Sequence, residues 1–511
     1  MGNSLKRALI SVYHKEGIES VGKKLCDRGW EIISTGGTAD YLEHNGITVT
    51  RVSEITSFPE ILNGRVKTLH PYIFAPILSK RTSDHIRQLN DHDMIKIDLV
   101  IVNFYPFEEY LNKGNHDDDF MVEKIDIGGP SMVRAAAKNY KDTIVIVDHK
   151  DYQPVVDKII AEGELTANER KALSAKAFAY TSFYDSLITG YLNNNDIFNH
   201  DFLNIGGRKL NDLRYGENPH QKSSIFISDP LSPFLKYEQL NGKELSYNNI
   251  LDLSMVYEVL NEFKDENENF TIIVKHQNPC GAALSSVQSD SFNKALEGDP
   301  ISAFGGIVGF NKTLDEKTAL LIKKIFFEVI IAPDFSDKSI EILKKKKNLR
   351  LIKIPLGFRE KFDLKTVPGG LIVQERDNLP DNNREFKIIT QQNDLEPNME
   401  DILFGWKLIR FVKSNGIIIV NNKQLIGVGA GQMSRIDSVK IAIEKSNFPL
   451  KGSVLLSDAF FPFKDSIEIA AENGISTVVE PGGSIRDEEV INEAKNRGIA
   501  LVFTGKRHFR H

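Results

Sequence analysis

Lys275 and His276 are adjacent side chains that can both transfer protons, and they directly follow a β-branched run at residues 271–274. Such a run is typical of a buried strand, and the Asn278-Pro279 step that follows favours a turn. Because open α/β sheets bind ligands at the carboxyl ends of their strands, a reactive pair is expected at this position. Taken alone, the dipeptide is more simply explained as a surface lysine beside a hydrogen-bonded histidine. Other motifs of the chain have to decide between this interpretation and a reactive pair.

A second candidate site is the glycine-rich turn Ser34-Thr35-Gly36-Gly37-Thr38. It lies between a predicted strand at residues 30–33 and a short predicted helix around Tyr41. This arrangement offers backbone N–H groups and a helix dipole to a phosphate, although an ordinary turn explains it equally well. The segment from Asn63 to Pro71 is rich in hydrogen-bond donors and poorly periodic, which predicts a functional loop.

The first 200 residues alternate predicted strands and helices, which indicates a doubly wound parallel sheet. Pro130 is expected to be the first residue of a helix that continues through residues 131–138, and residues 169–187 have the apolar spacing of a packing helix. Asn193-Asn194-Asn195-Asp196 indicates a domain boundary near residue 200. The cluster His116-Asp117-Asp118-Asp119 could hold a metal ion, but a solvated loop is the simpler interpretation. Strands are expected at residues 8–12, 30–33, 98–104 and 143–147.

Beyond residue 200 the β/α alternation continues, interrupted by a polar segment at residues 375–401 that is interpreted as an internal connection. Phe460-Phe461-Pro462-Phe463 would usually belong to a core, but Pro462 breaks regular structure and would leave rings exposed in a cleft. The chain ends in a donor-rich segment, Thr504 to His511, for which a disordered tail is the alternative. Glycine-rich turns are expected at residues 298–306 and 427–432, and strands at residues 307–310, 329–332, 416–420 and 454–456.

Composition limits the class of protein. A chain of 511 residues is too long for one core and predicts about three domains. The net charge of −6 gives no basic footprint for nucleic acid, and the one strong basic run, Lys344 to Lys347, is expected to follow a helix C-terminus in water. Two cysteines, Cys26 and Cys280, fit a reducing compartment. No apolar run approaches the roughly 18 residues of a membrane span, and no signal peptide is recognised, so a cytoplasmic protein without a membrane partner is expected.

Five stretches together resemble one family along essentially the whole chain. The family is the bifunctional purine-biosynthesis enzyme phosphoribosylaminoimidazolecarboxamide (AICAR) formyltransferase / inosine monophosphate (IMP) cyclohydrolase. The resemblance implies transfer of a formyl group from 10-formyltetrahydrofolate to AICAR, followed by closure of formyl-AICAR to IMP. It also implies a homodimer with formyl-transfer sites across the subunit interface. The stretches are residues 63–71, 126–139, 213–221, 275–281 and 460–465.

The resemblance also implies the fold and its division. Residues 1–200 would be a domain similar to methylglyoxal synthase. Residues 201–511 would be a formyltransferase region of two cytidine-deaminase-like α/β subdomains, at about 201–375 and 376–511.

The cyclohydrolase site that the resemblance implies uses lysine, tyrosine and aspartate side chains. Ring closure joins a carboxamide nitrogen to a formyl carbon and expels water, so it needs donors for an oxyanion and a proton for the departing hydroxyl. The catalytic residues would be Lys67, Tyr105, Asp126 and Lys138. The substrate phosphate would be bound by Ser11, Lys15, Ser34, Gly36, Gly37, Thr38 and Arg65.

In the formyltransferase, the resemblance makes Lys275 and His276 the catalytic pair. His276 would take the proton of the 5-amino group while Lys275 protonates or polarises the folate leaving nitrogen. Phe460 and Phe463 would face the pterin, Asp465 would accept hydrogen bonds from it, and His511 would lie against the same site. AICAR would be bound by Arg214, Tyr215, Asn415, Arg435 and Arg507.

Two departures from the family pattern bear on this assignment. Glu328 stands where some relatives have an aspartate that contacts AICAR. Cys280 lacks a second cysteine three residues on and a His-x-Glu partner, so the zinc-deaminase signature is absent. No catalytic metal is therefore expected, while a structural monovalent cation stays open.

Two other functions compete with this prediction. Residues 1–200 could be a regulatory sensor of a phosphate ligand, although binding alone would not need Lys67, Tyr105, Asp126 and Lys138. The chain could also be a zinc nucleoside deaminase, which the missing metal ligands argue against.

Overall fold

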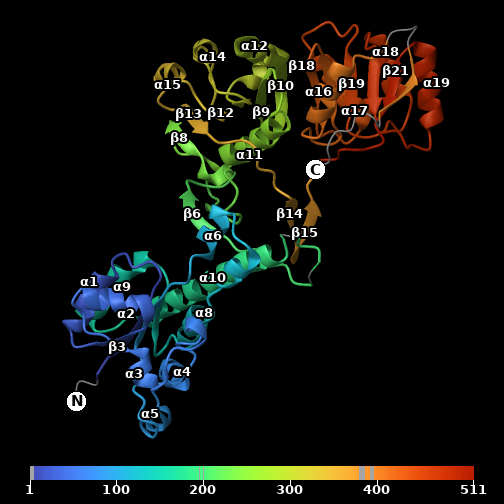
Figure 1. Cartoon of the computed structure of the whole chain (residues 1–511). Helices are drawn as coiled ribbons and strands as arrows, with labels where there is room; N and C mark the ends of the chain where they lie inside the picture. Colours follow the sequence, from blue (N-terminus) through green and yellow to red (C-terminus); the bar gives the residue numbers. More distant parts are fainter. Residues whose placement is uncertain (1–4, 195, 200, 379–385, 392–395) are drawn as a thin grey trace. The chain divides into compact units, whose positions relative to one another are not determined.

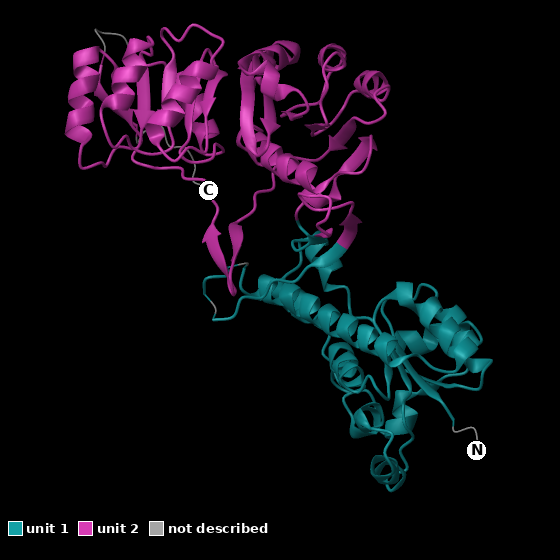
Figure 2. Ribbon diagram, turned by 180° about the vertical axis from the view of Figure 1, so that it is seen from behind, with its two compact units in different colours: residues 1–209, 226–231 teal, residues 210–225, 232–511 magenta. Residues whose placement is uncertain are grey.

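The computed structural model describes residues 5–194, 196–199, 201–378, 386–391 and 396–511. They divide into two compact units (Figure 2): unit 1 comprises residues 1–209 and 226–231, and unit 2 comprises residues 210–225 and 232–511. Strands β6 (Arg208–Leu213) and β7 (Ser223–Ile227) lie where the chain passes between the units. Asn195 of the expected boundary motif lies outside the described residues, as do residues 379–385 and 392–395 of the expected polar connection.

Within the described residues, unit 1 is built on a five-stranded sheet in which all neighbours pair in parallel. Every residue of the two strands β4 and β5 is buried, as expected for parallel strands covered on both faces. The predicted doubly wound parallel sheet is confirmed for this unit. In sheet order, its strands are β3 (Thr50–Arg51), β2 (Glu31–Ser34), β1 (Arg7–Ser11), β4 (Leu99–Val102) and β5 (Ile144–Ile146).

Helices cover both faces of this sheet (Figure 1). Helices α1 (Ile18–Cys26) and α9 (Tyr152–Glu162) bury their apolar sides in a core on one face. Helices α4 (Pro71–Leu78), α8 (Gly128–Lys138) and α10 (Ala167–Leu192) share a second core on the other. The other helical elements are α2 (Gly36–His44), α3 (Val52–Thr56), η1 (Leu62–Gly64), α5 (Ser83–Asn90), α6 (Phe107–Lys113), α7 (Asp118–Val122) and η2 (His149–Asp151).

Polar side chains explain where three of these helices begin. Thr166 and Glu169 form a capping box at the start of α10, which confirms the predicted packing helix and extends it. Helix α8 begins at Gly128, so Pro130 is its third residue and the predicted start is wrong by two residues. The earlier start follows from Asp126, because its Oδ1 accepts a 2.8 Å hydrogen bond from the N–H of Gly129. The cluster His116-Asp117-Asp118-Asp119 also has a local structural role. Asp117 caps α7, because its side chain accepts a 2.7 Å hydrogen bond from the N–H of Phe120.

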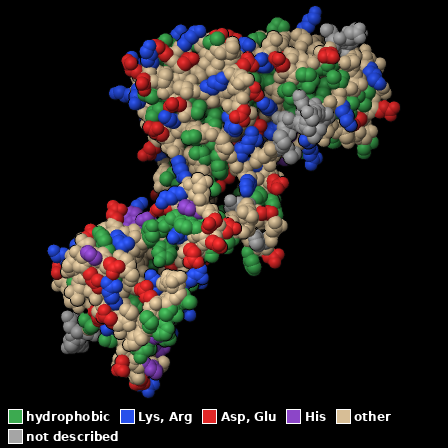
Figure 3. All heavy atoms as spheres, in the orientation of Figure 1, with side chains coloured by type: hydrophobic (Ala, Val, Ile, Leu, Met, Phe, Trp, Pro, Cys, Tyr) green, Lys and Arg blue, Asp and Glu red, His purple; other side chains and the backbone are tan. Residues whose placement is uncertain are grey.

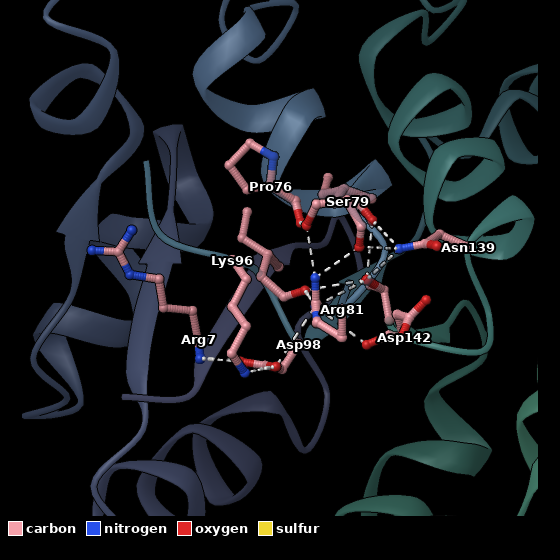
Figure 4. Close-up of polar contacts among 11 residues, drawn as sticks. Arg7, Pro76, Ser79, Arg81, Lys96, Asp98, Asn139 and Asp142 are labelled. Carbon is pink, nitrogen blue, oxygen red and sulfur yellow. Dashed lines mark hydrogen bonds and ion pairs between the residues drawn. The ribbon is translucent and has the colours of Figure 1, made fainter. Parts of the chain in front are cut away.

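Arg81 joins the ends of several elements of unit 1 (Figure 4). Its guanidinium donates to Ser79 Oγ at 2.7 Å and to the carbonyl oxygen of Ile97 at 2.7 Å, and it lies 3.7 Å from Asp98. Asn139, just after α8, donates to the carbonyl oxygen of Ser79 at 2.9 Å. Burial lowers the pKa of Arg81, while Asp98 opposes this shift. The network therefore fixes the end of α4 against the start of β4 and the end of α8.

Replacing Arg81 with methionine should destabilise unit 1 by about 2–3 kcal/mol, because the carbonyl oxygens around it lose a charged donor while they stay buried. Arg87→Met is the matched control. The side chain of Arg87 is 71% exposed and pairs with exposed Asp84, so its loss should cost less than about 0.5 kcal/mol. Urea unfolding of both variants beside the unmodified chain measures the difference. Equal midpoints for the two variants would contradict a stabilising role for the network.

In the part of unit 2 that the structure describes, twelve strands form one continuous mixed sheet (Figure 1). From one edge, the order β8-β13-β12-β11-β9-β10 is followed by the same order in reverse, β18-β17-β19-β20-β21-β16. In each half, three neighbouring strands are parallel and the others antiparallel. The halves join through β10 and β18, where Ala283 pairs with Gln424. Unit 2 thus contains two copies of one arrangement.

The helices repeat in the same way. Helices α11 and α16 share one core cluster, while α12, α14 and α15 pack on the first half and α17, α18 and α19 on the second. The first half comprises β8 (Glu238–Asn241), α11 (Tyr247–Glu262), β9 (Asn269–Lys275), β10 (Asn278–Ser285), α12 (Gln288–Gly298), α13 (Pro300–Ala303), β11 (Ile307–Phe310), α14 (Glu316–Ile322), β12 (Val329–Ala332), α15 (Asp337–Leu343) and β13 (Arg350–Lys353). The second half comprises β16 (Lys387–Thr390), α16 (Met399–Ile409), β17 (Ile417–Asn421), β18 (Gln424–Gly429), α17 (Arg435–Lys445), β19 (Val454–Ser457), α18 (Asp465–Glu472), β20 (Thr477–Glu480), α19 (Asp487–Arg497) and β21 (Ala500–Phe503). A separate two-stranded sheet is formed by β14 (Phe362–Val367) and β15 (Gly370–Glu375), and η3 (Phe234–Lys236) precedes β8.

The hairpin that carries the reactive pair differs from the expectation. Strand β9 continues to Lys275 and β10 begins at Asn278, so the turn is His276-Gln277 and the turn predicted at Asn278-Pro279 is wrong. Strand β11 runs antiparallel to β9. The end of the sheet that carries Lys275 is therefore the carboxyl end of β9 but the amino end of β11, and the rule for parallel sheets does not apply to it.

Two general properties complete the description. Figure 3 shows basic and acidic side chains interspersed over the visible face of both units. No helix in the described part of the chain is long and apolar enough to cross a membrane.

Candidate active sites

Unit 1 has a cavity of about 510 Å³ beside the N-termini of α2 and α8. Thr35, the N-cap residue of α2, makes no side-chain cap hydrogen bond, so the first N–H groups of this helix can bind an anion. Most of the residues predicted for the cyclohydrolase meet here. The lining includes Ser11, Lys15, Gly36, Gly37, Thr38, Arg65, Lys67, Tyr105 and Asp126.

Two glycines make room for Lys67 in this cavity. Gly64 has a φ of +84°, and a Cβ there would lie 2.6 Å from Lys67 Cε. Gly36, the first residue of α2, has a φ of +51°, and its Cβ would lie 3.3 Å from Lys67 Nζ. The ammonium group therefore reaches the N-terminus of α2, where it also pairs with Glu60 Oε2 at 3.4 Å. A cation and a helix N-terminus together favour a bound phosphate.

Asp126 is a half-buried carboxyl group just before the N-terminus of α8. Burial raises its pKa, while hydrogen bonds from backbone N–H groups and the charge of Lys67 oppose this shift. A Cβ at Gly129 would lie 2.6 Å from Asp126 Oδ2, so only glycine permits the close approach. Tyr105, which is 42% exposed, also lines the cavity. A carboxyl group with a raised pKa, a phenol and an ammonium group can donate and accept protons at one position.

The predicted phosphate-binding side chains differ in their contacts. Arg65 Nε donates to Glu123 Oε2 at 3.3 Å, and Lys15 Nζ donates to the carbonyl oxygen of Tyr13 at 3.3 Å. Thr38 Oγ1 is bonded to Val12, donating to its carbonyl oxygen and accepting from its N–H. Ser34 is fully buried, and its Oγ donates to the carbonyl oxygen of Ile10 at 2.7 Å. Its hydroxyl group therefore lies outside the cavity lining.

The structure does not bring Lys138 together with Lys67, Tyr105 and Asp126. Lys138 is the last residue of α8, and it lines a separate, shallow depression beside Phe178. At a rise of about 1.5 Å per residue, α8 separates its two ends by roughly 15 Å. One copy of unit 1 therefore supplies three of the four predicted catalytic residues to this cavity.

In unit 2, Lys275 and His276 lie beside a cavity of about 200 Å³. Lys275 Nζ donates to the carbonyl oxygen of Phe304 at 2.8 Å, and the side chain of His276 is exposed. Asp299 and Lys445 also line this cavity. A base and a cation at an accessible sheet end can deprotonate a nucleophile and stabilise negative charge.

A buried polar cluster lies at the same end of the sheet. Arg435 donates to Asn415 Oδ1 at 2.7 Å and to Ser457 Oγ at 3.0 Å, and it forms an ion pair with Asp458. Asn278, next to the hairpin turn, accepts a 3.1 Å hydrogen bond from the N–H of Lys413. Asn415 and Arg435, which are both predicted to bind AICAR, are thus held together at the end of the sheet where Lys275 and His276 lie.

The four-residue motif at 460–463 alternates exposed and buried rings. Phe460 and Phe463 are 38% and 47% exposed, whereas Phe461 is fully buried. The N–H of Phe461 donates to Glu480 Oε2 at 2.5 Å, and burial raises the pKa of Glu480 to about 8. Phe463 carries the guanidinium group of Arg486 over its ring at 4.7 Å, and Asp465 is the first residue of α18. Two partly exposed rings and a carboxylate thus follow one another closely along the chain.

The C-terminal segment has defined contacts, which argues against the disordered-tail alternative. The N–H of Arg510 donates to Ser414 Oγ at 3.1 Å, and Lys365 donates to the carbonyl oxygen of His511 at 2.9 Å. His508 is buried and hydrogen-bonded to Asp377. Arg507 is exposed, with its guanidinium 4.8 Å from the ring of Phe509.

Arg214 and Tyr215 form a pair of their own, with the guanidinium 5.5 Å from the ring centre. None of the described hydrogen bonds, ion pairs or ring contacts joins either residue to Lys275, His276 or Arg435. Among the described residues, no contact thus joins these two predicted AICAR ligands to the others.

Comparisons with known proteins cover nearly the whole chain. A family model of the MGS-like domain matches residues 17–131, and one of the AICARFT/IMPCHase bienzyme matches residues 136–445. The bifunctional purine biosynthesis protein PurH of Thermoanaerobacter sp. (strain X514) is 47% identical over 510 residues, which cover 99% of this chain and 100% of the relative. PurH of Caldicellulosiruptor bescii is 48% identical over 520 residues with the same shares covered.

The chain belongs to the AICARFT/IMPCHase bienzyme family. It is an AICAR formyltransferase and IMP cyclohydrolase, which carries out the final steps of IMP synthesis. The formyltransferase activity implies a folate formyl donor. A solved structure described as the crystal structure of ForH is 31% identical and covers 37% of this chain and 98% of its own, at a TM-score of 0.34.

Glu328 of the bienzyme lies just before β12, at the end of the sheet that carries Lys275. Its Oε2 accepts from Asn249 Nδ2 at 2.8 Å and from Arg350 at 3.4 Å. The Glu328 side chain, which is longer than an aspartate, is thus already hydrogen-bonded within the protein. No three His, Cys, Asp or Glu side chains gather as a possible metal site among the residues that the structure describes.

Sequence reasoning missed three carboxylates of the bienzyme that organise unit 2. Asp458 directly follows the buried strand β19, and Glu480 is the last residue of β20. A polar residue at the end of a buried strand is a signal that could have identified both. Asp252 lies inside α11, 24 residues before His276, and only the tertiary structure connects it to the reactive hairpin.

Proposed function

We propose that unit 2 transfers the formyl group of 10-formyltetrahydrofolate to the 5-amino group of AICAR, and that unit 1 closes formyl-AICAR to IMP. The observation that carries the cyclohydrolase half is the unit 1 cavity, in which Lys67, Tyr105 and Asp126 lie beside two helix N-termini. We also propose a cytoplasmic location, a domain boundary near residue 200 and a cytidine-deaminase-like fold for each half of residues 201–511. The repeated strand order of unit 2 supports the last point.

For ring closure, the phosphate of formyl-AICAR would bind the N–H groups of Gly36, Gly37 and Thr38. The carboxamide nitrogen attacks the formyl carbon, and the oxygen of the formyl group becomes an oxyanion. Lys67, opposite the N-terminus of α2, would stabilise this oxyanion. Asp126, whose pKa is raised by burial, would take the protons that the two ring-forming nitrogens lose and pass them to the oxyanion, which leaves as water, with Tyr105 beside it.

We infer that Lys138 joins this set from a second copy of the chain. The length of α8 keeps it roughly 15 Å from the Asp126 end within one copy, and its own surroundings include Arg134 and Phe178 on an open surface. The proposed homodimer offers such a second copy. This arrangement would also explain why a lysine with an assigned catalytic role lies on the outside of unit 1.

For formyl transfer, His276 would accept the proton of the 5-amino group as its nitrogen bonds to the formyl carbon. The tetrahedral intermediate then breaks its bond to the folate nitrogen, which takes a proton from Lys275. Asn415, Arg435 and Arg507 would bind AICAR, with Arg214 and Tyr215 reaching it as the proposed homodimer forms. Phe460, Phe463, Asp465 and His511 would surround the pterin.

No catalytic metal enters either step of this proposal. The full chain, dialysed against EDTA and supplied with AICAR and 10-formyltetrahydrofolate, should form IMP at an unchanged rate. Light scattering of the same sample should give the mass of a dimer. Loss of activity that Zn²⁺ restores would contradict the metal-free mechanism, and a monomer with full activity would contradict the shared sites.

A further inference from the structure

The turn that carries His276 has an uncommon backbone conformation. His276 and Gln277 both have positive φ, at 52° and 56°, although neither is glycine. Two-residue hairpins need this geometry so that the turn matches the twist of the strands, and asparagine and glycine adopt it more readily. Something outside the turn must therefore stabilise it.

Asp252 of α11 supplies that support. Its Oδ2 accepts a 3.1 Å hydrogen bond from the N–H of His276, and its Oδ1 accepts a 2.7 Å bond from the N–H of Gln277. Both carboxylate oxygens are thus used on the two turn residues. Burial raises the pKa of Asp252, and these two hydrogen bonds oppose the shift. Since α11 is packed into the core of unit 2, the carboxylate fixes the turn to a rigid element.

The second half of unit 2 repeats this arrangement without the reactive side chains. Asn422 and Lys423 form the turn between β17 and β18, with φ values of 52° and 53°. Asp401 of α16 accepts from their N–H groups at 3.0 and 2.6 Å. Lys423 pairs with Glu268 at 2.6 Å and is therefore engaged. A carboxylate thus supports each of the two turns, whether or not the turn does chemistry.

The two turns lie at opposite ends of the sheet. Gln424, which directly follows the second turn, pairs with Ala283 near the far end of β10. The N–H of Leu284 also donates to the carbonyl oxygen of Lys423 at 3.0 Å. Asp401 therefore makes the same two turn contacts as Asp252 at a place remote from Lys275, together with one further hydrogen bond from Asn398 Nδ2 at 2.9 Å. These shared turn contacts make it a control inside one protein.

We propose that Asp252 is a positioning residue for formyl transfer, because its carboxylate fixes the turn that aims His276 and the adjoining Lys275 at the reacting groups. This inference rests on the proposed roles of Lys275 and His276. A misplacement of reacting groups by about 1 Å can lower a rate roughly 100-fold. An asparagine at this position keeps the shape but presents an NH₂ group to one of the two N–H donors, so the turn loses one acceptor.

The test compares Asp252→Asn with Asp401→Asn in the full chain. Both should lower the melting temperature by a similar amount. Asp252→Asn should reduce kcat of formyl transfer by about 10- to 100-fold, with KM for AICAR and cyclohydrolase activity little changed. Asp401→Asn should leave formyl transfer within about threefold, since it is remote from the site. Equal formyl-transfer rates in the two variants would overturn the proposal.

A second variant separates support of the turn from any other effect of the charge. Glycine adopts positive φ without strain, so adding Gln277→Gly to Asp252→Asn should recover formyl transfer about two- to fivefold. If Asp252→Asn alone does not fold, the double variant with Gln277→Gly still tests the positioning role, because it should fold and retain activity. A folded double variant as inactive as Lys275→Ala would overturn the positioning role. Normal activity of Lys275→Ala would instead show that the proposed catalytic pair, not Asp252, was misassigned.

Discussion

Formyl transfer is expected to fall by at least about 100-fold when either His276 or Lys275 is replaced by alanine. The 5-amino group of AICAR is conjugated to a ring and a carboxamide, which makes it a weak nucleophile. Its proton has to be removed as the new bond forms, and a positioned general base contributes typically about 100- to 10,000-fold to such a step. The folate nitrogen leaves poorly as an anion, and loss of one donor that stabilises the transition state costs roughly 3–4 kcal/mol.

Steady-state assays of both activities, with thermal melts, measure this result. Cyclisation of formyl-AICAR should continue at its normal rate in both variants, because unit 1 has its own cavity. Asn422→Ala is the matched control, since Asn422 occupies the equivalent turn with the same φ as His276. It should lose a similar amount of stability but keep formyl transfer. Near-normal turnover in His276→Ala or Lys275→Ala would return that residue to the interpretation of a surface side chain at a strand end.

The elements that sequence reasoning predicted well are those that local pattern determines. Parallel strands buried on both faces appear as continuous apolar runs, which makes the strand at residues 143–147 recognisable. The helix at residues 169–187 is recognisable from the helical spacing of its apolar residues. The helix start at Pro130 was misplaced because the side chain of Asp126 caps the N–H of Gly129. A proline at the third helical position was therefore read as the first.

Long-range contacts account for what the sequence could not show. The turn at His276-Gln277 depends on Asp252, which is 24 residues away in the chain, whereas Asn278-Pro279 carries a local turn signal. The continuous sheet of unit 2 depends on the pairing of Ala283 with Gln424, which no local pattern predicts. The separation of Lys138 from Asp126, by contrast, could be predicted from local structure alone. Once residues 131–138 are assigned to a helix, its rise of about 1.5 Å per residue already places the two residues far apart.

Lys67→Ala is expected to lower cyclisation by at least about 100-fold and to cause formyl-AICAR to accumulate. Lys67 Nζ lies at the N-terminus of α2, in a space that the missing side chains of Gly36 and Gly64 create. An alanine there leaves the oxyanion of ring closure without its cation. Formyl transfer should stay within a few-fold of normal. Lys23→Ala, an exposed lysine of α1, should change neither activity. An unchanged rate of IMP formation in Lys67→Ala would make Lys67 a structural lysine.

Mixing this variant with Lys138→Ala tests whether the cyclohydrolase site is shared between two copies of the chain. If Lys138 acts in its partner's cavity, Lys138→Ala should also be inactive alone. A dimer of one Lys67→Ala chain and one Lys138→Ala chain would then have one complete site. Random exchange makes about half of the dimers mixed, so about one quarter of the normal cyclohydrolase activity should return. No recovery from two inactive variants would mean that both lysines act within one chain, and full activity of Lys138→Ala alone would limit the catalytic set to Lys67, Tyr105 and Asp126.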